Sequence, residues 1–341
     1  MKGGRWAVLG LLLLGLLTAH VIDIALFFRA PIPIGAQAQR VEIPPGATLR
    51  AVADQLHAQG LLDRPFYWRV YARLTDQAGR LKVGEYDLPP GTTPIGLLHL
   101  FVSGKTVQYG LTLLEGWSFK QVRAAIAAQP QIVQTLAGVD DAGVMVRLGA
   151  PGMHPEGWFY PDTYHFPRGT TDVEFLRRAH TLMQETLERE WSQRSEGLPL
   201  KAPYEALILA SIVEKETGVP EERPLIAAVF IGRLNKGMRL QTDPTVIYGM
   251  GDRYDGNIRK SDLLRDTPYN TYTRAGLPPT PIAMPSAAAI HAVLHPADSD
   301  ALYFVATGEG RHHFSATYEE HRAAVIKYQL GGNASRYQGG E

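Results

Sequence analysis

Glu214 and Glu216 are the side chains of this sequence with the best prospect of acid–base chemistry. They end a stretch from Tyr204 to Thr217 that is apolar nearly all round, which is typical of a buried helix, and Gly218 supplies a C-terminal stop. A carboxyl group in the last turn faces the negative end of the helix dipole. Partial burial and a second carboxylate nearby act in the same direction. All three effects favour the protonated form, which a general acid requires near neutral pH.

Of the two glutamates, Glu214 is the better candidate for a catalytic residue. It falls on the same helical face as Leu207 and Ser211, so it continues a packed stripe into the cleft that must cover the helix end. Glu216 points elsewhere and is the weaker candidate. Charged residues at a helix end are commonly no more than a solvated terminus, so the spacing alone does not establish a catalytic site.

Other groups of potentially catalytic residues in the sequence give weaker evidence for a site. His291 and His295 are four residues apart in a helix-like stretch, a spacing that zinc peptidases use, and His312 and His313 follow. The sequence has no H-E-x-x-H motif, however, and Pro296 ends the helix beside His295, so we interpret these histidines as surface or turn residues. Serine-hydrolase, phosphate-loop and dinucleotide motifs are missing. We therefore predict no metal and no cofactor.

The composition excludes further classes of protein. The 341 residues include no cysteine, which removes disulfides, thiolate metal sites and cysteine nucleophiles. Lys plus Arg and Asp plus Glu number 34 each, so the formal net charge is zero. A nucleic-acid-binding protein would carry a basic surplus that neutralises phosphates, so we expect no nucleic-acid partner.

The first thirty residues indicate the compartment. Residues 1–5 carry Lys2 and Arg5, and residues 6–28 are almost continuously apolar, long enough for a helix that crosses a bilayer. Positive charge before this segment predicts a cytoplasmic tail and a single-pass anchor in the inner membrane, with the rest of the chain on the periplasmic side. A cleaved signal peptide is the alternative, because residues 36–38 form an A-x-A-like site. The apolar run is longer and further from that site than in most signal peptides, which favours an anchor.

Two domains are expected after a linker at residues 29–40. Residues 41–109 contain two copies of a short strand, a glycine turn, a hydroxyl residue and an amphipathic helix, with Thr48 and Thr93 placed as helix N-caps. A third copy around Ser118 opens the next domain. With the helical stretch between them, the first two copies predict a βααβ module similar in element order to the LysM glycan-binding fold. A spacer without a binding role is the alternative, because a fold alone does not define a function.

Residues 110–330 form the second, larger domain in this interpretation, and residues 331–341 a flexible tail. A second helix begins near Pro220 and closes before Gly237, and residues 301–314 predict a hairpin. The predicted fold class is α+β. It comprises an N-terminal transmembrane helix, the small LysM-like module, and a larger α+β catalytic domain with a lysozyme-like catalytic helix.

The sequence around the two glutamates resembles the catalytic-helix motif of the YceG-like endolytic murein transglycosylases. The motif here is Ala210-Ser211-Ile212-Val213-Glu214-Lys215-Glu216-Thr217. Further similar segments lie at residues 156–164, 229–234, 237–249, 269–273, 276–279 and 303–306. The resemblance extends from the membrane anchor to about Tyr328.

This resemblance implies a lytic transglycosylase, a carbon–oxygen lyase that cleaves the β-1,4 bond between MurNAc and GlcNAc in peptidoglycan. The glutamate at the Glu214 position protonates the leaving oxygen and then, as a carboxylate, takes the proton of the C6 hydroxyl of MurNAc. That hydroxyl attacks its own anomeric carbon and leaves a 1,6-anhydro end. One carboxylate therefore suffices, where most glycosidases use two.

Five further residues are predicted to bind or border the glycan. Amides bond N-acetyl groups and hydroxyls, and aromatic faces stack on pyranose rings, so Asn270 and Tyr272 are the expected sugar contacts. Gln241 and Asp243 are expected to form a wall of the cleft, and Ser211 lies on the catalytic face of its helix. Packing and turn formation are the alternative roles for these side chains.

Two other functions stay open beside the transglycosylase. In a hydrolysing muramidase, Asp243 would serve with Glu214 as the second carboxylate. In a non-catalytic, membrane-anchored peptidoglycan-binding scaffold, the repeated strand–helix units would be the working part. The resemblance also implies cleavage of nascent strands that ends their elongation, beside penicillin-binding synthases and the elongation or division machinery.

Overall fold

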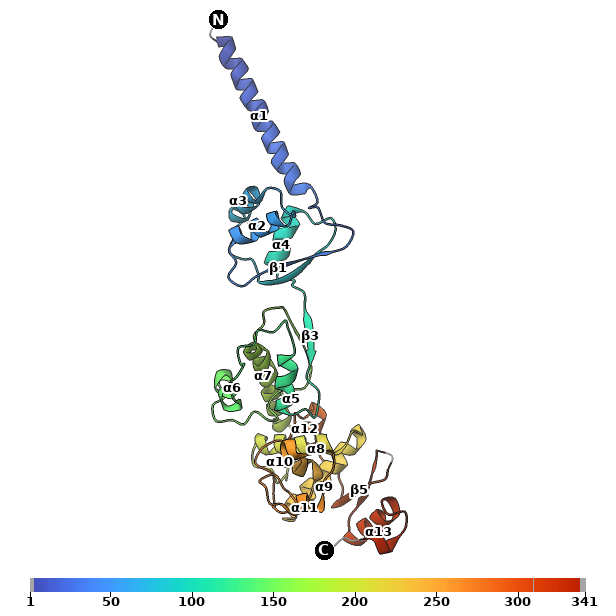
Figure 1. Cartoon of the computed structure of the whole chain (residues 1–341). Helices are drawn as coiled ribbons and strands as arrows, with labels where there is room; N and C mark the ends of the chain where they lie inside the picture. The colour runs from blue at the N-terminus through green and yellow to red at the C-terminus, as the bar shows by residue number, and fades with distance from the viewer. Residues whose placement is uncertain (1–2, 309, 338–341) are drawn as a thin grey trace. The chain divides into compact units, whose positions relative to one another are not determined.

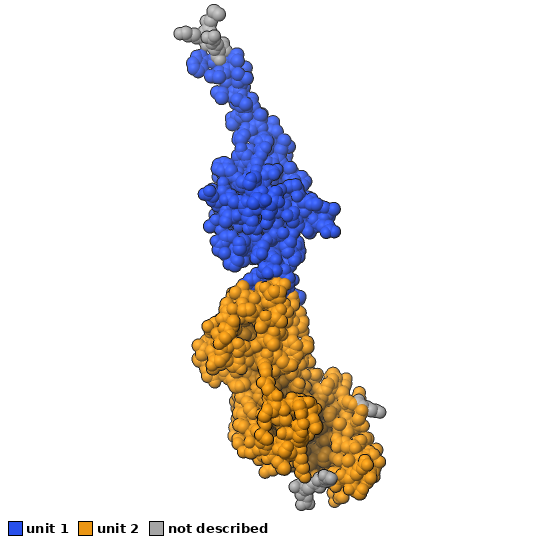
Figure 2. All heavy atoms as spheres, viewed as in Figure 1, with its two compact units in different colours: residues 1–109, 165–170 blue, residues 110–164, 171–341 orange. Residues whose placement is uncertain are grey.

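The computed structural model describes residues 3–308 and 310–337, and the chain divides into two compact units (Figure 2). Unit 1 holds the chain up to Tyr109 together with residues 165–170, and unit 2 holds the remainder. Helices and short strands are mixed in the chain, as predicted. The inclusion of residues 165–170 in unit 1 was not indicated by the sequence.

The N-terminal helix α1 spans Gly3–Arg29 (Figure 1). Within the part of the chain that the structure describes, one segment, Val8–Arg29, is long and apolar enough to cross a membrane. Its leucines are exposed along most of the helix. A helix with so much exposed apolar surface suits a lipid environment better than water.

Unit 1 is a small sheet covered by helices. Its further elements, in chain order, are β1 (Gln39–Ile43), α2 (Leu49–Ala58), α3 (Pro65–Leu74), β2 (Gly84–Leu88) and α4 (Pro94–Ser103). The two strands pair antiparallel, with Val41 opposite Tyr86. The first four elements follow each other in the predicted βααβ order, and whether this module is LysM-like stays a prediction.

The hydroxyl residues predicted as N-caps are confirmed in that role. Thr48 accepts a hydrogen bond from the backbone N–H of Ala51 at the start of α2, and Thr93 accepts one from Gly96 at the start of α4. Ser118 caps the next helix in the same way. Each cap satisfies an N–H group that the first turn of a helix leaves unpaired.

The segment expected to be a linker packs into unit 1. Ile32 belongs to the buried core of this unit together with Trp68, Tyr86 and Phe101. The N–H of Ile32 donates to the carbonyl of Thr92 at 2.8 Å. Because this segment buries apolar surface, α1 continues into the module without a free tether.

Helix α8 (Pro203–Glu216), the predicted glutamate helix, is the centre of unit 2. Its residues from Ala206 to Val213 are all buried. It packs against α7 (Asp172–Ser192), α9 (Arg223–Asn235), α10 (Asp243–Met250) and α12 (Ala287–Leu294). Because the middle of α8 is covered by these helices, polar side chains emerge from it only near its ends.

The remaining elements belong to unit 2, except that the first residue of β3 and the last two residues of β4 are assigned to unit 1. They are β3 (Tyr109–Thr112), α5 (Phe119–Ala127), α6 (Asp141–Leu148), β4 (Thr163–Phe166), η1 (Pro220–Glu222), η2 (Gly251–Arg253), α11 (Lys260–Leu264), β5 (Tyr303–Ala306), β6 (His312–Ser315), α13 (Tyr318–Tyr328) and η3 (Ala334–Arg336). Strand β3 pairs with β4 in a two-stranded sheet. The predicted hairpin is confirmed, since β5 and β6 pair antiparallel with Tyr303 opposite Ser315.

Candidate active site

A cleft of about 380 Å³ opens in unit 2 at the C-terminal end of α8. Its walls come from the end of α8, from α9, from the chain that enters α10, and from the β5–β6 hairpin with α13. Its polar lining includes Glu216, Arg233, Gln241, Asp243, Tyr272 and His312. The cleft therefore combines carboxylates, an amide and aromatic rings, which are the groups that bind sugars.

Glu216, the last residue of α8, is the glutamate that lines this cleft. It accepts a hydrogen bond from the hydroxyl of Thr242. Burial raises the pKa of Glu216 to about 7, and the neighbouring carboxylate of Asp243 acts in the same direction against the Thr242 hydrogen bond. A carboxyl group with this pKa is present in both protonation states at neutral pH, so it can donate a proton and later accept one.

Asp243 and Tyr272, two predicted substrate-side residues, lie together in the cleft lining. The phenol of Tyr272 donates to Oδ1 of Asp243 at 2.6 Å. Burial raises the pKa of Tyr272, and the carboxylate of Asp243 raises it further, so the phenol remains a donor. This bond holds the carboxylate of Asp243 and fixes the orientation of the Tyr272 ring.

Gln241 also lines the cleft, and its backbone lies in the left-handed region with φ 52°. Its N–H donates to the carbonyl of Thr271 at 3.2 Å, and Arg233 lies 3.4 Å from its side-chain oxygen. A residue other than glycine adopts this conformation at a cost of about 1 kcal/mol or more, and such residues concentrate at functional sites. The strain is an independent sign that this stretch of chain serves the cleft.

Arg233 is a cleft residue that the sequence analysis did not single out. Its guanidinium donates to the carbonyls of Leu302 at 2.7 Å and Leu240 at 2.8 Å, and it lies 5.2 Å from the ring centroid of Tyr303. It therefore ties the β5–β6 hairpin to the segment that carries Gln241. An arginine within the otherwise apolar face of a predicted helix was the available signal, because a buried guanidinium must find partners.

His312 was interpreted as a surface or turn residue, and the structure corrects this. It lies in strand β6, lines the cleft and is only 13% exposed at its side chain. Its Nδ1 is 2.8 Å from Glu222, and its N–H donates to the same carboxylate at 2.9 Å. The sequence contains no sign that His312 is buried, because its neighbours along the chain are polar. Its burial comes from η1 and α9, which pack against the hairpin.

Glu214, the favoured candidate from the sequence, is not among the described residues that line the cleft. Its carboxylate accepts from the N–H of Ser286 at 2.9 Å and from the Ser286 hydroxyl, and it lies 3.5 Å from Arg223. Ser286 is the N-cap of α12. Glu214 therefore joins α8 to α9 and α12, whereas Glu216 lines the cleft; the assignment of Glu214 as the acid–base residue stays a prediction.

Two other predicted substrate residues lie in the packed interior. Ser211 is fully buried, donates to the carbonyl of Ile208 at 2.7 Å and accepts from the N–H of Ile282 at 2.9 Å. These bonds connect α8 to the chain before α12. The hydroxyl of Ser211 is therefore engaged within the fold, and its predicted contact with glycan stays a prediction.

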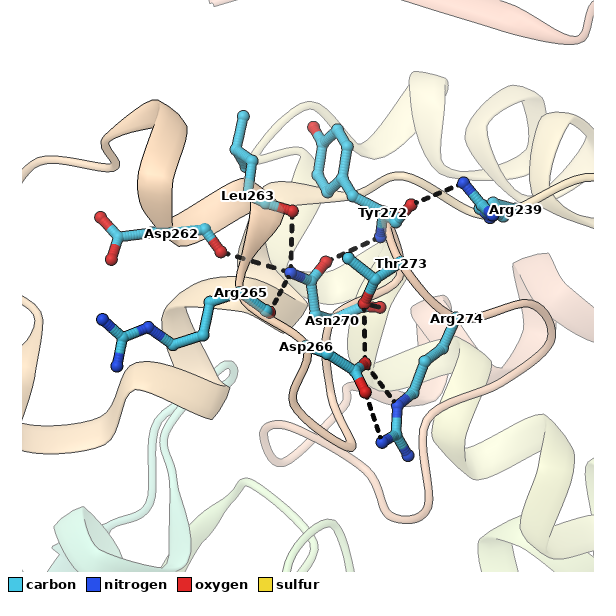
Figure 3. Close-up of polar contacts among 9 residues, drawn as sticks. All are labelled: Arg239, Asp262, Leu263, Arg265, Asp266, Asn270, Tyr272, Thr273 and Arg274. Carbon is cyan, nitrogen blue, oxygen red and sulfur yellow. Dashed lines mark hydrogen bonds and ion pairs between the residues drawn. The ribbon is translucent and has the colours of Figure 1, made fainter.

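Asn270 is 1% exposed and braces its own loop (Figure 3). Its amide nitrogen donates to the carbonyls of Leu263 at 2.9 Å and Arg265 at 2.7 Å, and its oxygen accepts from the N–H of Tyr272 at 2.8 Å. Both ends of the amide are therefore engaged. The geometry supports a role in placing Tyr272 rather than direct contact with sugar.

The histidine pair weighed as a zinc site lies outside the cleft. The rings of His291 and His295 are 4.4 Å apart, and with Glu190 they bring three donor atoms within 4.8 Å of one another. His291 is exposed and already bonds Glu190 at 2.9 Å. The spacing would admit a metal ion, and neither histidine is among the described residues that line the cleft.

A cleft at the end of a buried helix, with one carboxyl group of raised pKa, is the arrangement of an acid–base enzyme. A family model described as the YceG-like family matches residues 41–327. The chain therefore belongs to the YceG-like family, which confirms the resemblance seen in the sequence.

Relatives with established names are similar over most of this chain. An endolytic murein transglycosylase of Bacillus subtilis (strain 168) is 32% identical over 306 residues, which is 84% of each chain. One of Streptococcus pneumoniae serotype 2 is 29% identical over 342 residues, covering 87% of this chain and 60% of the relative. A crystal structure of a YceG-like protein from Listeria monocytogenes is 30% identical with a TM-score of 0.54, covering 84% of this chain and 99% of that one.

Proposed function

We propose that this chain is an endolytic lytic transglycosylase that cleaves MurNAc–GlcNAc bonds in peptidoglycan strands. The observation that carries the proposal is the carboxyl group of Glu216, which lines the cleft of unit 2 with a pKa of about 7. The names of the Bacillus and Streptococcus relatives support the substrate and the reaction. A lyase that uses an internal hydroxyl as nucleophile needs one such group, whereas most glycosidases need two.

In this mechanism Glu216 acts twice. Its protonated carboxyl group donates to the glycosidic oxygen, and the bond between that oxygen and C1 of MurNAc breaks. The C6 hydroxyl of the same MurNAc then attacks C1, and the carboxylate takes the hydroxyl proton, which restores the acid. The products are a strand with a 1,6-anhydro-MurNAc end and a strand with a free GlcNAc hydroxyl.

The side chains around Glu216 would help to bind and orient the glycan. The ring of Tyr272, oriented by its hydrogen bond to Asp243, would stack on a pyranose ring. The strained segment at Gln241 would present an amide to sugar hydroxyls or N-acetyl groups. Asp243 also lines the cleft, so a hydrolysing muramidase with Glu216 and Asp243 as its two carboxylates is the second candidate.

The apolar helix α1 supports a location of this activity at the membrane. Helix α1 would cross the inner membrane once, with Lys2 and Arg5 on the cytoplasmic side and unit 2 on the periplasmic side. The βααβ module of unit 1 would act as a LysM-like glycan-binding element. Penicillin-binding synthases and the elongation or division machinery are the proposed partners, because cleavage of nascent strands would then end their growth.

Product analysis with paired variants tests the proposal. The full chain in detergent, Glu216→Gln and Glu214→Gln would each be incubated with uncrosslinked glycan strands, and the products weighed by mass spectrometry. We expect internal cuts with 1,6-anhydro-MurNAc ends, and a rate loss of about 10²-fold to 10⁴-fold in Glu216→Gln because the general acid is gone. Glu214→Gln should keep the same products in its folded fraction.

The other outcomes separate the alternatives. Reducing MurNAc ends would identify a hydrolase and direct attention to Asp243. Loss of cutting in Glu214→Gln, with full activity in Glu216→Gln, would restore Glu214 as the acid. Binding of strands without cleavage by the parent chain would favour the scaffold.

A further inference from the structure

The last turns of α1 and the helix α3 of unit 1 are joined by specific contacts. Asp23 of α1 accepts two hydrogen bonds from Arg64, which precedes α3, the longer at 2.8 Å. One helical turn earlier, Nε2 of His20 lies 3.3 Å from the hydroxyl of Tyr67. The ring of Phe28 lies 5.0 Å from that of Tyr71. Figure 1 shows α3 beside the C-terminal end of α1.

The length of α1 sets the depth of these contacts in a bilayer. Asp23 follows Trp6 by 17 residues, which is about 26 Å of helix. The hydrocarbon core of a bilayer is about 30 Å thick, and tryptophan prefers its boundary. With Trp6 at one boundary, Asp23 lies at or just inside the other, so its partner Arg64 and the start of α3 lie at the membrane surface.

Helix α3 exposes the apolar and basic side chains that a helix at the membrane surface requires. Phe66 is 61% exposed and Leu74 is 81% exposed, and with Val70 they follow a spacing of four residues along one face. The helix contains no acidic residue, and of its two arginines Arg73 is exposed, whereas Arg69 pairs with Asp54 at 3.4 Å. Its opposite face, with Trp68 and Ala72, is buried in the core of unit 1.

A hollow of about 250 Å³ lies at the same junction. Its lining includes the charged Asp23, Asp63 and Arg64 and apolar residues such as Leu26, Phe27 and Pro94. A hollow lined by both charged and apolar side chains suits the boundary between lipid headgroups and acyl chains.

We propose that helix α3 is an interfacial helix that docks unit 1 on the lipid surface of the membrane that α1 spans. Phe66 and Leu74 enter the boundary of the acyl chains, and the exposed Arg73 contacts anionic headgroups. A helix that lies in the membrane interface buries apolar side chains in this way and places basic side chains against anionic lipid. The inference rests on the proposed membrane span of α1 and goes beyond it, since a span alone would leave the module free of the lipid.

Fluorescence quenching in bilayer nanodiscs tests the docking with the full chain. Since the sequence has no cysteine, Phe66→Cys and Leu74→Cys can each carry a single environment-sensitive NBD label. Val83→Cys, an exposed apolar position elsewhere in unit 1, is the matched control, and Leu13→Cys reports on the span itself. Discs would contain phosphatidylcholine, with or without phosphatidylglycerol, and lipids spin-labelled near the headgroup or deep in the chain.

Docking predicts loss of fluorescence at positions 66 and 74 with the shallow spin label, larger in phosphatidylglycerol discs, and none at position 83. Quenching at position 13 without quenching at 66 and 74 would overturn the docking and leave the anchor intact. No quenching at position 13 would overturn the span and the docking together. Equal quenching at 66, 74 and 83 would mean that unit 1 lies on lipid without using α3. Unchanged circular dichroism spectra would show that the labelled chains are folded.

Discussion

Two glutamates two positions apart in α8 occupy different environments. Glu214 lies against Ser286 and Arg223 between three helices, whereas Glu216 lines the cleft beside Thr242 and Asp243. A separation of two residues turns a side chain by about 200° around a helix. The two carboxyl groups therefore lie on opposite sides of α8, Glu214 toward α12 and Glu216 toward the cleft.

The activity should fall as the pH rises through about 7. Burial raises the pKa of Glu216 to about 7, so above this pH the carboxyl group loses the proton that the leaving oxygen needs. Initial cleavage rates measured at a series of pH values would show this descending limb in the parent and in Glu214→Gln. A rate that stays level to pH 9 would mean that Glu216 is not the acid.

At the scale of the elements, the loop between α11 and the Tyr272 segment depends on one side chain. Asn270 connects the carbonyls of Leu263 and Arg265 to the N–H of Tyr272 (Figure 3). In the sequence this residue has the chemistry of a sugar ligand. Only the fold shows that the amide is enclosed by its own loop.

Asn270→Ala should destabilise unit 2 by about 1–3 kcal/mol, because partly buried backbone groups lose their hydrogen-bond partners. Thermal unfolding of the variant and the parent would measure the loss as a lower Tm. At temperatures where both are folded, the KM for glycan strands should change little. A raised KM with an unchanged Tm would instead support direct contact between Asn270 and sugar.

At the scale of the whole molecule, stability should depend on a second buried carboxyl group, Glu156. It is 3% exposed and accepts hydrogen bonds from the N–H of Phe119 at the start of α5 and from the hydroxyl of Tyr248 in α10. Burial raises its pKa from 4.5 to about 7. The folded state therefore holds this proton more tightly than the unfolded state, and the protein loses stability as the pH rises from about 4.5 through 7.

Glu156→Gln removes this titration and should gain stability relative to the parent as the pH rises, by up to about 3 kcal/mol above pH 7. The two proteins should unfold at similar temperatures near pH 5. Unfolding followed by circular dichroism at pH 5 and pH 8 would measure the difference, with Glu196→Gln at an exposed position as the control. An equal difference in unfolding temperature between Glu156→Gln and the parent at both pH values would contradict the raised pKa of Glu156. Glu216 titrates in the same range, so part of the pH dependence should remain.

The sequence by itself determined the features that depend on local pattern. The apolar run of α1, the buried helix α8, the N-caps Thr48, Thr93 and Ser118, and the β5–β6 hairpin all follow from spacing and residue type. The motif around α8 was long enough to identify the family. These features are readable because each is encoded within one short stretch of chain.

Only the tertiary structure decided which polar side chains share a cleft. The grouping of Glu216 with Arg233, Gln241 and His312 joins segments that are distant in the sequence, and the enclosure of Ser211 and Asn270 comes from elements packed around them. Helical spacing shows that Glu214 and Glu216 face different ways. Which of them packs against α12 and which lines the cleft depends on the elements around α8, because burial and pKa are set by neighbours in space rather than along the chain.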